Sequence, residues 1–97
     1  SAVSDTMRKD LREVVDDVTS RVDLNGGDVV LDIGANDCTM LSYFDSSLAR
    51  IGVEPAENIE WDHVDESITI VNDYFSWQAV ESTLAGSKGI YKLRYVL

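Results

Sequence analysis

Apolar residues recur every three or four positions over the first part of the chain, the pattern of a helix with one buried face. The predicted helix runs from Asp5 to Val22, and its apolar stripe is Met7, Leu11, Val14, Val15, Val18 and Val22. Ser4 is a suitable N-cap, because its hydroxyl can accept a hydrogen bond from a free amide of the first turn. Asn25-Gly26-Gly27 predicts the end of the helix and a turn, since glycine adopts positive φ angles without strain.

After this helix, short runs of β-branched residues alternate with helical patterns. The predicted strands are 29–33, 50–54, 67–72 and 90–97. The predicted helical segments are 40–48, one turn within 56–61, and 75–86 with Gly86 closing it. Strands separated by helices indicate right-handed βαβ units, so we expect an α/β fold with a mainly parallel sheet of about four strands. A chain of 97 residues is expected to form one domain, residues 1–97.

The charge balance is strongly acidic, with 8 Lys and Arg against 18 Asp and Glu, a net charge of −10. Nucleic acid is therefore not an expected partner, because binding its phosphates requires clustered basic residues. The single cysteine, Cys38, cannot form an internal disulfide, the first residues given do not have the basic-then-apolar pattern of a signal peptide, and there is no run of 18 apolar residues. We therefore expect a soluble cytoplasmic protein without membrane contact. Cys38 and the single histidine, His63, do not have the spacing of a metal site.

Three carboxylates stand at the predicted ends of successive strands: Asp32, Glu54 and Asp73. Open α/β sheets bind ligands at the carboxyl ends of their strands. Glu54 follows Asp32 by 22 positions, close to the roughly 20-residue offset at which a carboxylate binds both ribose hydroxyls of an adenosine. The spacing therefore predicts an adenosine-containing ligand.

The loop from Asp32 to Thr39 discriminates between such ligands. A dinucleotide fingerprint needs glycine at positions 34, 36 and 39, and only Gly34 is present. Asp32 and Asp37 would also repel two phosphates, whereas they would attract an ammonium and a sulfonium. The loop thus favours S-adenosylmethionine over NAD, and a dinucleotide-dependent oxidoreductase domain remains an alternative.

Two segments, 30–41 (VLDIGANDCTML) and 52–56 (GVEPA), resemble the first two motifs of class I S-adenosylmethionine-dependent methyltransferases. Within that class they resemble most the nucleotide-sugar C-methyltransferase branch, whose loop commonly reads Asp-Ile-Gly-Ser/Ala-Asn-Asp-Gly-Thr-Leu-Leu. The segment 72–75 (NDYF) is similar to the acidic-aromatic segment of that branch. The resemblance covers roughly residues 7 to 76. It implies a Rossmann-like three-layer fold with strand order 3-2-1-4, truncated relative to the seven-stranded methyltransferase fold.

The resemblance also implies roles for residues of the first loop. Asp32 would lie near the methionine amino group of the cofactor, directly or through water. Gly34 would let the backbone approach the ligand, because it has no Cβ. Ala35 and Asn36 would line the same turn. Cys38 departs from the pattern, which has glycine there: a positive φ at this position would cost about 1–2 kcal/mol for a cysteine. Its side chain could also crowd the ligand, so we expect weak or lost binding.

In the second and third loops, the resemblance implies that Glu54 holds the ribose hydroxyls and that Pro55 lies against the adenine. Asp73 would accept a hydrogen bond from the adenine amino group, with Tyr74 adjacent. No catalytic base is identified, and the methyl acceptor is expected to be a sugar nucleotide or another small molecule. In the similar enzymes, catalytic and substrate-binding parts lie beyond the fourth strand, so we expect an incomplete domain that holds the cofactor at most.

A function of another class remains open at the end of the chain. Basic residues alternate there with apolar ones, as in a half-buried strand: Lys92, Leu93, Arg94, Tyr95 and Leu97. A strand with a free flank can pair with a second copy. The alternative function is therefore a non-catalytic Rossmann-like interaction module that forms a homodimer through its last strand.

Overall fold

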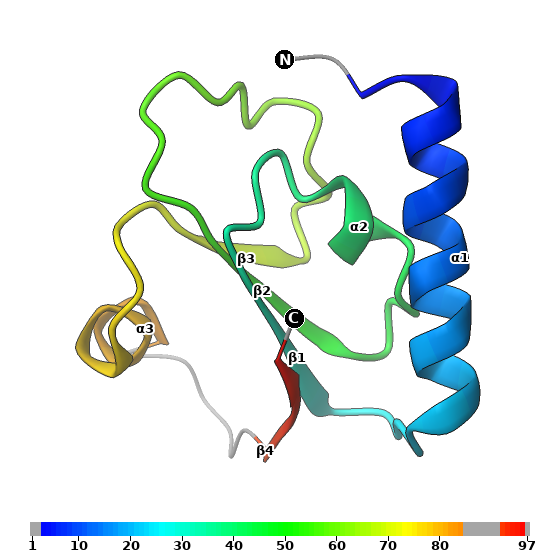
Figure 1. Ribbon diagram of the computed structural model, residues 1–97. Helices are drawn as coiled ribbons and strands as arrows, with labels where there is room; N and C mark the ends of the chain where they lie inside the picture. Colours follow the sequence, from blue (N-terminus) through cyan, green and yellow to red (C-terminus); the bar gives the residue numbers. More distant parts are fainter. Residues whose placement is uncertain (1–2, 85–91, 97) are drawn as a thin grey trace.

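A computed structural model describes residues 3–84 in full and the backbone of residues 92–96. The elements follow in the order α1 (Asp5–Arg21), β1 (Asp28–Ile33), α2 (Thr39–Ser42), β2 (Ala49–Val53), β3 (Ile68–Val71), α3 (Trp77–Leu84) and β4 (Lys92–Val96). Figure 1 shows α1 and α2 on one side of the sheet and α3 on the other. The predicted α/β class is confirmed.

The sheet is parallel, as predicted. Asp32 of β1 lies beside Gly52 of β2, and Gly52 lies beside Ile70 of β3. The backbone of β4 also pairs parallel with β1, with a register shift between Val29 and Val30, so the strand order is β3-β2-β1-β4. The carboxyl ends of β1, β2 and β3 therefore meet at one edge of the sheet, which is called the carboxyl edge below.

Alternating residues of the strands form two separate cores. The core under α1 and α2 contains Val15, Val18, Val30, Ala35, Cys38, Leu41, Phe44, Leu48 and Ile68. The core under α3 contains Val29, Leu31, Ile51, Val53, Val71 and Val80. Even-numbered positions of β1 and β2 face the first core, so Asp32 and Gly52 lie on the α1 and α2 side of the sheet.

Most predicted elements are present, with two differences. Ser4 caps α1, as predicted, by accepting a hydrogen bond from the Met7 amide at 3.2 Å. Helix α2 is much shorter than predicted and ends at Ser42; a turn follows in which the Asp45 carboxylate accepts from the Ser47 amide at 2.9 Å. The predicted helical turn within 56–61 is wrong: that segment has no helix.

The last predicted elements extend past the residues that the structure describes. The prediction that Gly86 closes the third helix lies outside the described residues, as do positions 90, 91 and 97 of the predicted fourth strand. Among the helices that the structure describes, none combines the length and the apolar character needed to span a lipid bilayer.

Candidate functional site

Backbone hydrogen bonds join the loops that follow the first three strands. The amides of Gly34 and Ala35 both donate to the carbonyl of Val53, at 2.8 and 3.0 Å. The amide of Glu54 donates to the carbonyl of Val71 at 2.9 Å. These bonds continue the parallel ladders past the ends of the strands, so the three loops form one connected surface at the carboxyl edge.

Glu54 is held in a fixed orientation at this edge. Its Oε1 accepts from the Asn36 amide at 2.8 Å, and its Oε2 accepts from the Ala56 amide at 3.0 Å. The side chain is half-buried. Each carboxylate oxygen can accept more than one hydrogen bond, so each keeps capacity for a ligand donor. Two fixed oxygens suit a ligand with two adjacent hydroxyls.

Asp32 is buried to a greater extent, at 4% exposure, and lies near Glu54. Burial, followed by the negative charge of Glu54, raises the pKa of Asp32 to about 6. Within the described part of the chain, no group donates a hydrogen bond to the Asp32 carboxylate. Its oxygens are also not fully enclosed, unlike Nε of Arg50, which is enclosed and has no hydrogen-bond partner among the described residues. The oxygens of Asp32 therefore retain access from outside the protein. A buried carboxylate without a donor is destabilised unless something supplies a donor or a positive charge.

The loop between these carboxylates has a left-handed backbone at three positions. Gly34 has a φ of 79°, and a Cβ added there would meet no atom within 4 Å, so this side of the loop is open. Asn36 has a φ of 53°, which asparagine tolerates. Cys38 has a φ of 63°. The position that is glycine in the resembling motif therefore has a positive φ here.

The Cys38 side chain is directed into the core under α1 and α2. It is only 1% exposed, and a Cβ added to Gly52 would approach its sulfur to 2.6 Å. Burial, followed by the charges of Asp32, Asp37 and Glu54, raises the pKa of the Cys38 thiol to about 12. Cys38 thus fills space above Gly52, and the effect of its side chain on ligand binding stays a prediction.

The remaining predicted site residues differ in how they face the edge. Ala35 is buried in the core, so only its backbone can face a ligand. Pro55 is half-buried. Asp73 and Tyr74 are exposed beyond the end of β3, where the Asp73 carboxylate accepts from the Tyr74 amide at 2.7 Å.

Sequence reasoning missed Asn72, which connects the second and third loops. Its side-chain amide donates to the carbonyl of Glu54 at 2.7 Å and to that of Ala56 at 2.9 Å. These contacts and the bond from the Ala56 amide to Glu54 hold the start of the second loop against the end of β3. The only available signal was an asparagine directly after a β-branched strand.

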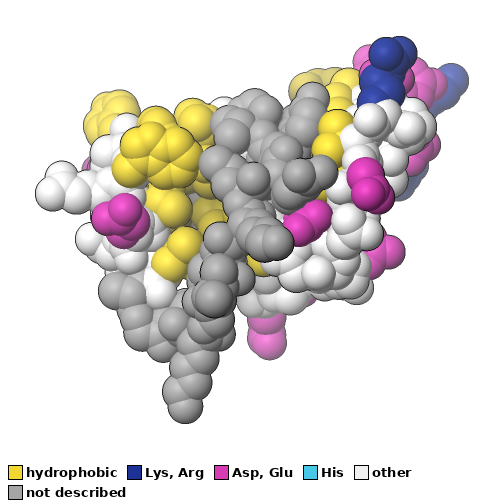
Figure 2. All heavy atoms as spheres, turned by 90° about the horizontal axis from the view of Figure 1, so that it is seen from below, with side chains coloured by type: hydrophobic (Ala, Val, Ile, Leu, Met, Phe, Trp, Pro, Cys, Tyr) yellow, Lys and Arg dark blue, Asp and Glu magenta, His cyan; other side chains and the backbone are white. Residues whose placement is uncertain are grey.

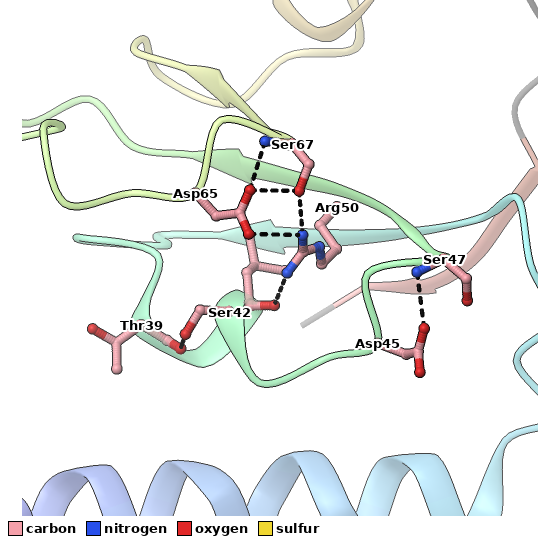
Figure 3. A network of polar contacts seen from close by, with 8 residues as sticks. Thr39, Ser42, Asp45, Ser47, Arg50, Asp65 and Ser67 are labelled. Atoms are coloured by element: carbon pink, nitrogen blue, oxygen red, sulfur yellow. Dashed lines mark hydrogen bonds and ion pairs between the residues drawn. The ribbon is translucent and has the colours of Figure 1, made fainter.

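A second missed residue, Arg50, is buried on the same face of the sheet as Asp32 and anchors the end of the loop that follows Glu54. Figure 3 shows its guanidinium between the backbone of α2 and the 65–67 turn. Nη1 donates to the Leu41 carbonyl at 3.4 Å, Nη2 donates to the Ser67 hydroxyl, and the Asp65 carboxylate lies 3.8 Å away. Hydrogen bonds from Ser67, first of all from its amide, lower the pKa of Asp65.

Two cavities flank the carboxyl edge, and neither is lined by Asp32 or Glu54. One, of about 540 Å³, lies between the start of α1, residues 37–39 and residues 58–65, and includes His63. The other, of about 470 Å³, lies between the end of β3 and α3 and includes Asp73. Neither carboxylate therefore lies in these two cavities.

Large apolar side chains are exposed near this edge: Ile33, Tyr74, Phe75 and Trp77. Figure 2 shows hydrophobic side chains gathered at the end of the molecule that carries α3. Phe75 and Trp77 contact each other edge to face, with ring centroids 5.2 Å apart. Within residues 3–84, no group of three His, Cys, Asp or Glu side chains is placed to hold a metal ion.

Comparison with known proteins adds no assignment. No protein-family model matches this sequence, and no curated protein matches it significantly. The resemblance to methyltransferases therefore depends on the motifs of the sequence and on the residues at the carboxyl edge.

Proposed function

We propose that the carboxyl edge binds S-adenosylmethionine and that this domain is the cofactor-binding portion of a class I methyltransferase. The observation that carries the proposal is Asp32, a carboxylate that is 4% exposed, reachable from outside and without a hydrogen-bond donor in the described part of the chain. Burying such a group without a partner lowers the stability of the folded protein, and binding of a cationic ligand offsets this cost.

The contacts at the edge support a division of roles. Asp32 would face the amino and sulfonium groups, and the open side of Gly34 would admit the ligand next to the backbone. Glu54, whose two oxygens are oriented by the Asn36 and Ala56 amides, would accept from the ribose hydroxyls. The proposed adenine contacts are Pro55, Asp73 and Tyr74.

When bound, S-adenosylmethionine supplies an electrophilic methyl group to an acceptor held in line with its sulfonium. The acceptor is proposed to be a sugar nucleotide or another small molecule. What the residues of this chain contribute is binding and orientation of the cofactor. No residue is assigned as a base.

Isothermal titration calorimetry with S-adenosylmethionine tests the proposal. We expect saturable binding to the wild type and to Asp28→Asn, a control at the other end of β1, and at least a tenfold loss with Asp32→Asn. Absence of heat from the wild type at millimolar ligand, or equal binding by Asp32→Asn, would remove the proposal. Binding of NADH in place of S-adenosylmethionine would favour the dinucleotide alternative.

A second candidate function is an interaction module that forms homodimers. It is favoured by one observation, the position of β4 at the end of the strand order. Edge strands present unpaired amides and carbonyls to a partner. Light scattering after size-exclusion chromatography would give a mass that rises with concentration to that of a dimer; a monomer at every concentration would contradict this function.

A further inference from the structure

We infer that the cavity between the start of α1, the start of α2 and the second loop, residues 54–67, is a separate binding site for a small organic amine with an apolar body. The cavity measures about 540 Å³, which lies within the range of small-molecule sites. None of the residues proposed to contact the cofactor lines it. The inference therefore goes beyond the proposed function and does not depend on it.

Four segments that lie far apart in the sequence form the walls of this cavity. They are residues 3 and 8 at the start of α1, residues 37–42, residues 58–65, and the first residue of β3. Figure 1 shows the second loop extending toward the same end of the molecule as the start of α1. Arg50 connects two of these walls, because its guanidinium donates to the Leu41 carbonyl and to the Ser67 hydroxyl. The cavity is therefore part of the folded structure.

The most deeply placed side chains of the cavity wall are apolar. Cys38 and Ile68 are buried, and the half-buried Val3, Ile59 and Val64 lie beside them in the wall. Contact with these side chains removes hydrocarbon surface of a ligand from water, which favours binding. The ligand is thus expected to carry an apolar body.

Two of the charged side chains in the wall already have partners of opposite charge. Nη1 of Arg8 lies 3.2 Å from Oδ1 of Asp5. The Asp65 carboxylate lies 3.8 Å from Nη2 of Arg50, and its Oδ1 accepts from the Ser67 amide at 2.8 Å. These pairs leave little net charge at the cavity.

Two carboxylates remain in the wall, those of Asp37 and Glu60, and neither forms an ion pair within residues 3–84. Oδ1 of Asp37 accepts from the amide and hydroxyl of Thr39 at 3.1 and 2.6 Å, so its second oxygen keeps its capacity. Asn58 and a neutral His63 add hydrogen-bonding groups without charge. The cavity is therefore negative and favours a cation over an anion.

A primary amine combines the required properties. Its ammonium group carries a positive charge and three donors and has no acceptor, so it suits carboxylates with unused oxygens. The ammonium would face Glu60 and Asp37, and the body would contact the apolar side chains. Because hydrogen bonds between ions are about twice as strong as neutral ones, an amine should bind about fivefold more tightly than an alcohol of the same shape.

NMR titration of the full chain with three probes of similar shape tests the inference. The probes are 2-phenylethylamine, 2-phenylethanol and 3-phenylpropanoate. We expect the amine to shift the amide signals of residues 37–39 and 58–65 with a Kd of about 1 mM, which suits so small a ligand. The alcohol should bind about fivefold more weakly, and the carboxylate most weakly. The preference for the amine should shrink at high salt, because these carboxylates are open to screening.

Two variants of the second loop test the role of charge without a change in side-chain size. Glu60→Gln should reduce the preference for the amine over the alcohol about threefold. Asp62→Asn is the matched control, because Asp62 is exposed on the same loop and does not line the cavity. It should leave the preference unchanged. Glu60 is exposed as well, so neither variant is expected to affect folding.

The outcomes separate this inference from the proposed function. If no probe shifts residues 37–39 and 58–65, the second site is overturned. If the alcohol or the carboxylate binds as tightly as the amine, or if Glu60→Gln behaves like Asp62→Asn, the assignment to an amine is overturned. Failure of S-adenosylmethionine to shift residues 32–36 and 54–56 would contradict the proposed function alone.

Discussion

Strand β1 carries a buried carboxylate near each end, and the two are stabilised differently. Asp28, at the amino end, is 8% exposed and accepts from the Asn25 amide at 2.9 Å, while its own amide donates to the Asn25 carbonyl at 3.0 Å. Asp32, at the carboxyl end, is 4% exposed and receives no such bond within residues 3–84. One carboxylate closes the turn that begins the strand. The other is maintained at a cost to stability, and this difference supports the proposal that the carboxyl edge is the ligand-binding end.

The largest expected effect distinguishes these two residues by stability. Because the pKa of Asp32 is raised from 3.8 to about 6 in the folded protein, its ionisation disfavours folding by up to about 3 kcal/mol above pH 6. Asp32→Asn should therefore raise the free energy of unfolding at pH 8 by up to about 3 kcal/mol. Asp28→Asn should lower it by about 1 kcal/mol, because a charged acceptor of a backbone bond becomes neutral.

The same difference predicts how stability depends on pH. Between pH 4 and about 6 the folded protein holds a proton on Asp32 that the unfolded chain has released, so this contribution to stability falls as the pH rises. Urea unfolding of the wild type and both variants at several pH values measures it. A wild-type and an Asp32→Asn curve that stay parallel from pH 4 to pH 8 would show that Asp32 is not destabilising.

Arg50 is the next test, because it is a buried charge with partners. Arg50→Met removes the donor to the buried Leu41 carbonyl and to the Ser67 hydroxyl, and should lower the free energy of unfolding by about 2 kcal/mol. Chemical denaturation measures the change, with Arg21→Met as an exposed control that should change stability by less than about 0.5 kcal/mol. If Arg50→Met left the free energy of unfolding unchanged, the hydrogen bonds of Arg50 would not stabilise the fold. The contrast between buried charges with and without hydrogen-bond partners would then be contradicted.

Gly52 tests how closely the loop approaches the sheet. A Cβ there would lie 2.6 Å from the Cys38 sulfur and 3.0 Å from the Ala35 Cβ, so Gly52→Ala should destabilise the protein by about 1–3 kcal/mol. Adding Cys38→Gly should recover part of the loss, because the closest contact is removed. Strict additivity of the two changes would contradict a direct contact.

The smallest expected effect concerns the strained backbone at Cys38. Cys38→Gly relieves about 1 kcal/mol of left-handed strain but loses a buried side chain of similar value, so stability should change by less than about 1 kcal/mol. Cys38→Ala keeps the strain and loses the sulfur, and should be the less stable of the two. Thermal unfolding ranks them, and the reverse order would exclude strain at this position.

Whether the sequence predicts a feature of this fold depends on how far apart along the chain the contacting residues are. The α1 cap at Ser4 and the meeting of Asp32 with Glu54 follow from local patterns and from the rule that parallel strands end at one edge. The bonds of Asn72 reach carbonyls 16 and 18 positions earlier, and Arg50 reaches Ser67 across 17 positions. No local pattern encodes such contacts, which hold the second loop at Glu54 and Ala56 and at Ser67.

The most direct test of the account is the titration of the Asp32 side-chain carboxyl carbon by NMR, with and without saturating S-adenosylmethionine. Without ligand, burial and Glu54 place the pKa of Asp32 at about 6. A bound cation favours the ionised form, so the ligand should lower this midpoint by at least one pH unit. A ligand-free midpoint near 3.8, or a midpoint that stays near 6 when ligand is bound, would contradict the account.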